Sequence, residues 1–271
     1  HLCIRLPNHV GAYADMGVDP AQVVEAGVDM INLSCHYNTT QVTDMKSVRA
    51  MVPETPLYFE FSFMTQHLRR RGQLRAKRRL LTPEQLRTAA LLAYRQGATG
   101  VSAFNFMYYR RYSEWVNLRS DDMDLKVDCE PPFEVVRELK SIDTVSRSDQ
   151  HYFRVFRHRL AADCPLAIPW QLARPAEGWS DDATLRVQAD QSLGSRKIGA
   201  RFNGHLLQAS EDTREPYPNP YGPPGLGRPE ELRAWTVPTA YLEDGDNAVE
   251  ITLQAGDEVD LVWVDLAARA R

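Results

Sequence analysis

Four apolar runs, each followed by a helical pattern, constrain the fold of this chain more than any other feature. They predict strands at residues 2–7, 29–37, 57–63 and 101–108. Strands that alternate with helices pair in parallel through right-handed crossovers, so the first half of the chain predicts an α/β fold.

Capping residues and prolines predict the helices between and after these strands. Helix starts and stops lie at Asp19-Pro20 and Gly27, at Thr43 and Pro53, at Thr82-Pro83 and Gly97, and from Pro131-Pro132 onward. The strongest signal is Thr82-Pro83-Glu84-Gln85, which combines a Thr cap, a proline in the first turn and a Gln three residues after the cap.

Polar side chains within the strands separate two parallel architectures. They share the inward register of their strands: Arg5; Asn32, Ser34 and His36; Glu60 and Ser62; and Asn105. Central strands of a doubly wound sheet are apolar on both faces, and no GxGxxG motif or P-loop follows any strand. A (β/α)8 barrel with a polar mouth fits better, so the four units predict half of a barrel. The chain opens with His1 just before a strand, and we expect residue 1 to lie inside a larger fold.

The pattern changes near residue 150, where helical periodicity gives way to short alternating segments. These predict strands at 184–189, 197–202, 205–208, 234–237, 248–253 and 258–264. Turn residues separate the segments, including a tight hairpin turn at Asn203-Gly204, so we expect an all-β sandwich or jelly roll. The predicted domains are a partial barrel at 1–145 and a β-sandwich at 151–271, joined by a linker at 141–150.

Charge and composition bear on several classes of partner. The net charge of -4 gives no general attraction to nucleic acid. A basic run from Arg69 to Arg79 is interpreted as a solvated surface, with a grip on an anionic substrate as the alternative. Nucleic-acid binding is a third interpretation, which the negative net charge and the absence of interleaved aromatic residues disfavour. The sequence contains no apolar stretch of about 18 residues, so we predict no membrane span, and no signal peptide is visible.

The four cysteines form no CxxC pair, which argues against a zinc ribbon or a thioredoxin-like site. Cys3 and Cys35 lie in apolar strands and are predicted to be buried. The sequence does not decide whether Cys129 and Cys164 form a disulfide. No His or carboxylate pair stands at ligand spacing, so we predict neither a metal nor a cofactor.

Glu60 is the candidate catalytic residue. It shares one side of the strand Leu57–Phe63 with Tyr58 and Ser62, while Leu and Phe fill the other side. An ionised carboxylate in such a strand is costly to bury unless it is paired or used. The structural interpretation pairs Glu60 with Arg5 or bonds it to neighbours such as Tyr58 or His36. The catalytic interpretation places it at a barrel mouth. Glycoside hydrolysis needs a second carboxylate, which would lie upstream or come from a loop bearing Glu114, Asp121 or Asp122.

Polar and aromatic residues near the strand ends are candidates for binding a carbohydrate substrate. The candidates are Arg5, Asn32, His36, Tyr58, Asn105, Tyr108 and Trp115. Aromatic rings at a strand end can stack on sugar rings, although the same residues also serve as core or rim packing. His36 has an equally simple interpretation as a polar residue that satisfies local backbone groups.

Three segments resemble the later part of family-10-like glycosyl hydrolase barrels of bacterial proteins. They are Val18–Met30, Tyr58-Phe59-Glu60-Phe61 and Gly97–Phe106. The resemblance covers residues 1–140 and implies that the four strands are the fifth to eighth. It places Glu60 on the seventh strand as nucleophile of a retaining enzyme, and the acid/base on a fourth strand that this chain lacks. Residues 151–271 resemble galactose-binding-like modules, and a secreted, periplasmic or cell-surface location is implied.

The leading prediction is therefore hydrolysis of glycosidic bonds in a polysaccharide or oligosaccharide. One alternative is a non-catalytic carbohydrate-binding or cell-surface protein on a degenerate barrel. Another is a barrel lyase or isomerase that uses Glu60 as a general base.

Overall fold

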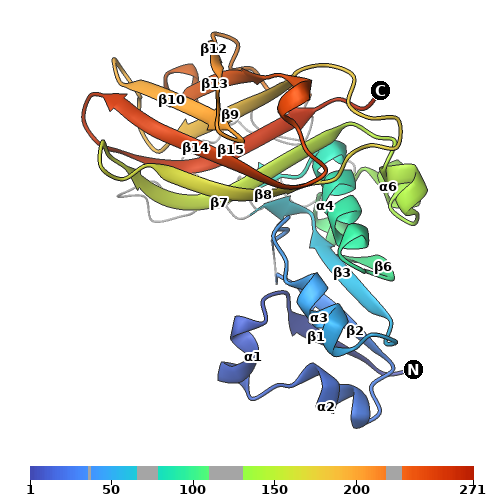
Figure 1. Ribbon diagram of the computed structural model, residues 1–271. Coiled ribbons are helices and arrows are strands. Elements are labelled where there is room, and N and C mark those ends of the chain that lie inside the picture. The colour runs from blue at the N-terminus through green and yellow to red at the C-terminus, as the bar shows by residue number, and fades with distance from the viewer. Residues whose placement is uncertain (36–37, 66–78, 110–130, 218–227) are drawn as a thin grey trace. The chain divides into compact units, whose positions relative to one another are not determined.

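The computed structural model describes residues 1–35, 38–65, 79–109, 131–217 and 228–271 (Figure 1). The chain divides into two compact units. The first comprises His1–Thr65 and Leu86–Val145, and the second comprises Gln66–Gln85 and Ser146–Arg271. The fold is mixed, with more strand than helix among the described residues.

A four-stranded parallel sheet forms the framework of the first unit. Its strands are β1 (Cys3–Pro7), β2 (Met30–Ser34), β3 (Leu57–Ser62) and β6 (Gly100–Phe104), in the order β1-β2-β3-β6. All three pairings are parallel, which confirms the predicted strand direction. Four neighbouring parallel strands fit either half of a barrel or part of an open sheet, so the half-barrel remains a proposal.

Short helices connect and follow these strands. The remaining elements of this part of the chain are α1 (Gly11–Met16), α2 (Pro20–Glu25), α3 (Met45–Met51), β4 (Met64–Thr65), α4 (Pro83–Arg95), η1 (Phe106–Tyr109), α6 (Phe133–Glu138) and α7 (Ile142–Val145). Thr43 was predicted to cap α3, but the N-cap position of that helix is Asp44. The caps predicted at Asp19 and Thr82 are confirmed: Asp19 Oδ1 accepts from the Ala21 N–H at 2.8 Å. Thr82 Oγ1 accepts from the Gln85 N–H at 3.3 Å, while Gln85 Oε1 accepts from the Thr82 N–H at 3.1 Å.

The parallel sheet has one apolar face and one polar face. On the apolar face, Ile31, Leu33, Leu57 and Phe59 are fully buried. On the other face the register aligns Arg5 with Asn32 and Tyr58, and Ser34 with Glu60 and Ser102. The shared register predicted for Arg5, Asn32, Ser34 and Glu60 is therefore confirmed, whereas His36 lies outside the described residues.

The second unit contains two antiparallel sheets. Its strands and 3-10 helices are β5 (Arg79–Leu80), β7 (Gln150–Leu160), β8 (Leu166–Leu172), β9 (Ala183–Ala189), β10 (Lys197–Phe202), β11 (His205–Leu206), β12 (Gln208–Ser210), η2 (Pro229–Glu231), β13 (Leu232–Val237), η3 (Thr239–Tyr241), β14 (Gly245–Ala255) and β15 (Val259–Ala268). One sheet has the order β11-β10-β14-β8 and the other β12-β13-β9-β15-β7. The hairpin between β10 and β11 turns at Asn203 and Gly204, both with positive φ, as their sequence predicts.

Aromatic side chains join the two sheets. Tyr152 of β7 meets Trp170 of β8 edge-on, with ring centroids 6.5 Å apart. The Arg154 guanidinium lies 5.5 Å from the centre of the same indole, and burial lowers the pKa of Arg154 to about 10. The arrangement is that of a β-sandwich, with its core between the sheets (Figure 1).

The short β5 and the two longer strands β7 and β8 of the second unit escape the sequence prediction. β7 begins at Gln150, inside the predicted linker 141–150, and α7 occupies residues 142–145 of that linker. β7 carries charged residues whose burial depends on partners distant in sequence. β8 contains Pro169 and lies at a sheet edge, where a strand tolerates a residue without an N–H donor.

The cysteine predictions are partly corrected. Cys3 is exposed, because its side chain alternates away from the apolar face, and Cys35 is only half-buried. Cys164 is an exposed free thiol, and Cys129 lies outside the described residues. No helix in the described part of the chain is both long and apolar enough to cross a membrane.

Candidate functional site on the parallel sheet

Glu60 lies at the centre of a polar cluster on the sheet. Arg5 Nη2 lies 2.6 Å from Glu60 Oε1. Ser34 Oγ donates to the same oxygen at 2.5 Å, and Asn32 Nδ2 donates to Oε2 at 2.8 Å. All three partners are donors, an arrangement that suits a carboxylate acting as nucleophile or base better than one acting as proton donor.

The partners of Glu60 are themselves linked by hydrogen bonds. Arg5 Nη2 donates to Ser34 Oγ at 2.8 Å, so the hydroxyl both accepts from the guanidinium and donates to the carboxylate. Ser102 Oγ donates to Asn32 Oδ1 at 2.8 Å, which fixes the amide with its NH2 group toward Glu60. Residues of β1 and β2 therefore hold the carboxylate of β3 directly, and Ser102 of β6 supports it through Asn32.

The cluster combines a buried carboxylate with a partly exposed cation. The Glu60 side chain is 7% exposed and the Arg5 side chain 35%. The Arg5 guanidinium lies 4.3 Å from the centre of the Phe104 ring, and this cation–π contact holds the guanidinium in addition to its contacts with Glu60 and Ser34. Solvent thus reaches the ion pair on the arginine side.

Tyr58 packs beside the cluster on the same face. A Cβ atom built on Gly100 would lie 2.8 Å from Tyr58 Cε1, so the absence of a side chain at residue 100 makes room for the ring. The Tyr58 side chain is half-buried, as expected for a residue at the margin of a polar face.

The structure assembles only some of the predicted site residues. Arg5 and Asn32 contact Glu60 directly, where the sequence suggested that they position substrate. Asn105 does not lie in a strand: β6 ends at Phe104, and Asn105 has φ 55° before η1. Its side chain therefore lacks the strand register that the sequence prediction assigned to it.

Three predicted residues are not described in full. His36 and Trp115 lie outside the described residues, as do the loop carboxylates Glu114, Asp121 and Asp122. The Tyr108 side chain is also outside the described part, although its backbone belongs to η1.

Ser102 is a member of the cluster that sequence reasoning missed. The run Gly100–Phe104 reads as apolar with one small polar residue, and a lone serine gives no signal of a role. The available signal was its strand position: in parallel register it lies beside Glu60. Within the four strands Glu60 is the only carboxylate. Among the described residues, no group of three His, Cys, Asp or Glu side chains is placed to hold a metal.

A second buried carboxylate lies in the β-sandwich unit. Asp265 of β15 accepts from Arg186 Nε at 3.0 Å and lies 3.1 Å from His151 Nε2. Arg186 also bonds Glu215, which accepts two hydrogen bonds from Arg79 at 3.0 and 2.8 Å. Arg79, the last residue of the basic run, is therefore buried in an ion pair and not solvated. The other basic residues of the run lie outside the described residues.

Comparison with known proteins gives weak matches only. No family model and no curated protein matches the chain. One similar solved structure is a β-porphyranase of glycoside hydrolase family 86 from Bacteroides plebeius, with 16% identity and a TM-score of 0.32 over 45% of this chain and 21% of that chain. Dimeric latent PorU from Porphyromonas gingivalis is 10% identical, with a TM-score of 0.27 over 45% of this chain and 13% of that chain. A family 35 carbohydrate binding module from Clostridium thermocellum is 13% identical, with a TM-score of 0.24 over 43% of this chain and 90% of that chain. TM-scores at this level establish no shared fold, and the matched part spans about a fifth of the porphyranase.

Proposed function

We propose that this chain belongs to a carbohydrate-active enzyme that hydrolyses glycosidic bonds, with Glu60 as the nucleophile. The observation that carries the proposal is the Glu60 carboxylate, held by three donors on the polar face of a parallel sheet. A carboxylate fixed in this way is oriented for attack on an anomeric carbon, since both of its oxygens are positioned before substrate arrives.

The strand order supports a barrel as the framework of the site. Strands β1, β2, β3 and β6 pair in the order in which they occur along the chain. Winding that continues in one direction closes a barrel, whereas a doubly wound sheet reverses its order at a switch point. We therefore propose that residues 1–145 form half of a (β/α)8 barrel, with the family-10-like motifs as its strands five to eight, followed by a β-sandwich module at 151–271.

The proposed reaction needs a second carboxylate that protonates the leaving oxygen. A retaining enzyme places the two carboxyl groups about 5–5.5 Å apart. The four strands contribute only Glu60, so the acid/base would be Glu114, Asp121 or Asp122 of this chain or a residue of the remaining barrel strands. A protein that acts on polysaccharide in this way would be secreted or displayed at the cell surface.

The decisive experiment replaces Glu60 with Gln in a protein that contains the whole barrel. We expect hydrolysis of the best polysaccharide in a reducing-sugar screen to fall by about 10³-fold or more, because the amide cannot form a glycosyl ester. Glu138→Gln is the matched control, since Glu138 bonds Arg87 away from the polar face. Undiminished turnover by Glu60→Gln removes Glu60 from catalysis.

Chemical rescue separates a nucleophile from a general base. In Glu60→Ala, azide can displace the leaving group of an aryl glycoside directly, and the product would be a glycosyl azide of inverted configuration. Rescue without a glycosyl azide would instead favour a general-base role, as in a barrel lyase or isomerase.

The second candidate is a non-catalytic carbohydrate-binding or cell-surface protein on a degenerate barrel. The observation that favours it is the short contact between Arg5 and Glu60, because an ion pair of this kind also serves structure alone. Saccharide binding with no hydrolysis by the whole barrel, and wild-type binding by Glu60→Gln, would decide for this alternative.

A further inference from the structure

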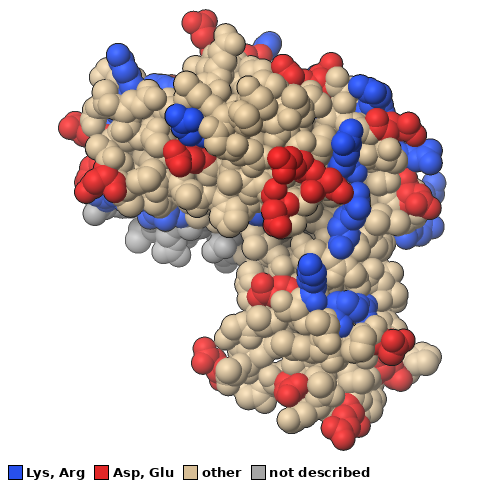
Figure 2. All heavy atoms as spheres, in the orientation of Figure 1, with Lys and Arg blue, Asp and Glu red and all other residues tan. Residues whose placement is uncertain are grey.

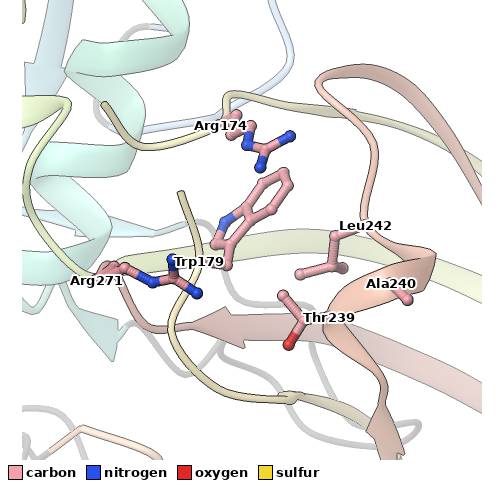
Figure 3. Close-up of a pocket in the computed structure, with 6 residues that line it drawn as sticks. All are labelled: Arg174, Trp179, Thr239, Ala240, Leu242 and Arg271. Atoms are coloured by element: carbon pink, nitrogen blue, oxygen red, sulfur yellow. The ribbon is translucent and has the colours of Figure 1, made fainter. Parts of the chain in front are cut away.

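The β-sandwich unit contains a cavity of about 310 Å³, drawn in Figure 3. It is lined by Arg174, Trp179, Thr239, Ala240, Leu242 and Arg271. Trp179 and Leu242 are only 4% and 7% exposed, so the largest apolar side chains of the lining present no face for a ligand to pack on. We assign no ligand to this cavity, and the polar face of the parallel sheet is more informative.

On that polar face, hydrogen bonds lead from the edge strand β6 to Glu60 in two steps. Ser102 Oγ donates to Asn32 Oδ1 at 2.8 Å, and Asn32 Nδ2 donates to Glu60 Oε2 at 2.8 Å. Ser102 lies directly beside Glu60 in the strand register, yet its hydroxyl is bonded to Asn32 of β2, on the other side of β3. The described contacts therefore connect Ser102 to the carboxylate through the amide.

The direction of these bonds follows from the charge on Glu60. An ionised carboxylate only accepts hydrogen bonds, so the Asn32 amide turns its NH2 group toward it. The amide oxygen then points to Ser102, whose hydroxyl has to donate. The chain of bonds therefore has one direction, from the hydroxyl through the amide to the carboxylate.

Neither the amide nor the carboxylate is oriented by its own torsional preference. The terminal torsions of Asn and Glu are broad, so no narrow minimum selects one plane for either group. Arg5 and Ser34 hold Oε1 of the carboxylate and Asn32 holds Oε2, so the second contact fixes its plane. The Asn32 amide is likewise held at both of its ends, by Glu60 and by Ser102.

We infer that Ser102 is a positioning residue for the chemistry of Glu60, which it orients through Asn32. The inference rests on the proposed function and adds to it a residue beyond the three direct partners of the carboxylate. Ser102 and Asn32 are both half-buried, so neither serves mainly to fill the core. Loss of the Ser102 hydroxyl should loosen the plane of the carboxylate without removing a contact to substrate, and misorientation of a reacting group slows the reaction.

The test uses a protein that contains the whole barrel and a dinitrophenyl glycoside of the sugar that the hydrolysis screen identifies. In the first step an electron pair of Glu60 forms the bond to the anomeric carbon, while the pair of the glycosidic bond leaves with the dinitrophenolate. This leaving group needs no proton from the acid/base, so the rate of the step reports the nucleophile alone. Stopped-flow release of the dinitrophenolate gives the maximal rate and the half-saturating substrate concentration.

We expect Ser102→Ala to lower the maximal rate about five- to tenfold, the factor contributed by one hydrogen bond between neutral groups, and to change the half-saturating concentration by less than about twofold. Ser102→Thr keeps a hydroxyl and should restore the rate. Ser102→Cys keeps the size but has a weaker donor, so its rate should lie between those of Ser102→Ala and the wild type.

Two further variants separate the path from a general effect on the fold. In an Asn32→Ala background, Ser102→Ala should cause no additional loss, because both residues act through the same amide. Ser210→Ala is the matched control, since Ser210 is a half-buried serine of β12 whose hydroxyl accepts from the Asp212 N–H. Thermal unfolding of every variant confirms that the rates belong to folded protein.

The results that overturn the inference are distinct from those that overturn the proposed function. A wild-type rate in Ser102→Ala, no rescue by Ser102→Thr, an equal loss with and without Asn32, or a raised half-saturating concentration at an unchanged rate overturns the inference alone, provided that Glu60→Gln is inactive. Undiminished hydrolysis by Glu60→Gln, or no hydrolysis of any glycoside by the wild type, overturns the proposed function and this inference together.

Discussion

Each unit of the molecule buries a carboxylate against an arginine, and the two pairs differ in what surrounds them. In the β-sandwich, the side chains of Asp265, Arg186 and His151 are all 0% exposed. In the parallel sheet, Glu60 is buried but the Arg5 side chain is 35% exposed. We call Asp265 and Arg186 the sealed pair, and Glu60 and Arg5 the open pair. The sealed pair is confined to a structural role because solvent does not reach it, whereas the open pair can exchange a partner for a ligand on its exposed side.

The electrostatics of the sealed pair follow from its burial. Burial alone would raise the pKa of Asp265, but Arg186 and His151 outweigh it and hold that pKa well below its usual value. Asp265 is thus an anion that nothing in solvent can reach.

The surface charge is mixed. On the face drawn in Figure 2, acidic and basic side chains of the described residues are interspersed.

The largest expected effect comes from breaking the sealed pair. Asp265→Asn should lower the free energy of unfolding by about 3–5 kcal/mol, because it leaves the Arg186 charge buried without its main partner. The double variant Arg186→Met with Asp265→Leu should be less destabilised than the single variant. Urea unfolding followed by tryptophan fluorescence reports this unit, which holds four of the five tryptophans.

A control of matched chemistry is available in the same unit. Asp212 accepts hydrogen bonds from Arg214, and both side chains are exposed. Asp212→Asn should leave the unfolding curve almost unchanged, since exposed pairs contribute little. If Asp265→Asn is no more destabilising than this control, the contrast between sealed and open pairs is wrong.

Acid should reveal the second effect. A carboxyl with a depressed folded pKa adds stability above its unfolded pKa, about 3.9, and loses that contribution as pH falls toward the folded value. Wild-type stability should therefore decline as pH drops below about 4, and Asp265→Asn should decline less steeply over the same interval. Unfolding free energies measured across this range check the slope, and equal slopes would contradict the assignment.

The smallest expected effect comes from the open pair. Glu60→Gln should lower the free energy of unfolding by only about 1 kcal/mol, because Arg5 can turn its exposed side to water and the amide still accepts one hydrogen bond. Thermal unfolding followed by far-UV circular dichroism measures it, beside Glu138→Gln. A loss as large as that of Asp265→Asn would mean that Glu60 is a structural residue of the same kind.

The parts of the fold that the sequence predicted correctly are those with local causes. The caps at Asp19 and Thr82, the turn at Asn203 and the parallel strands each depend on a few neighbouring residues or on a short periodic pattern. β7 and β8 were missed because Arg154 is buried by an indole of another strand and Pro169 is tolerated only at a sheet edge. Neither condition is visible in the segment itself.

The candidate site was predicted in part. Glu60 stood out because a carboxylate breaks the apolar pattern of its strand, and register placed Arg5 and Asn32 on the same face. Ser102 carried no such signal, since a serine in a strand is ordinary. Asn105 was misplaced because β6 ends one residue before it, at a positive φ that the pattern did not predict.

By itself, the sequence determined where α2 and α4 begin, where one hairpin turns and which face of the first three parallel strands is polar, because these depend on contacts between near neighbours. Only the tertiary structure decided that Glu60 is bonded by Arg5, Asn32 and Ser34, and that Arg79 is buried against Glu215. Those partners are tens of residues or more apart in the chain. Their pairing is set by strand register and by the free energy of leaving a buried charge without a partner, which exists only once the chain has folded.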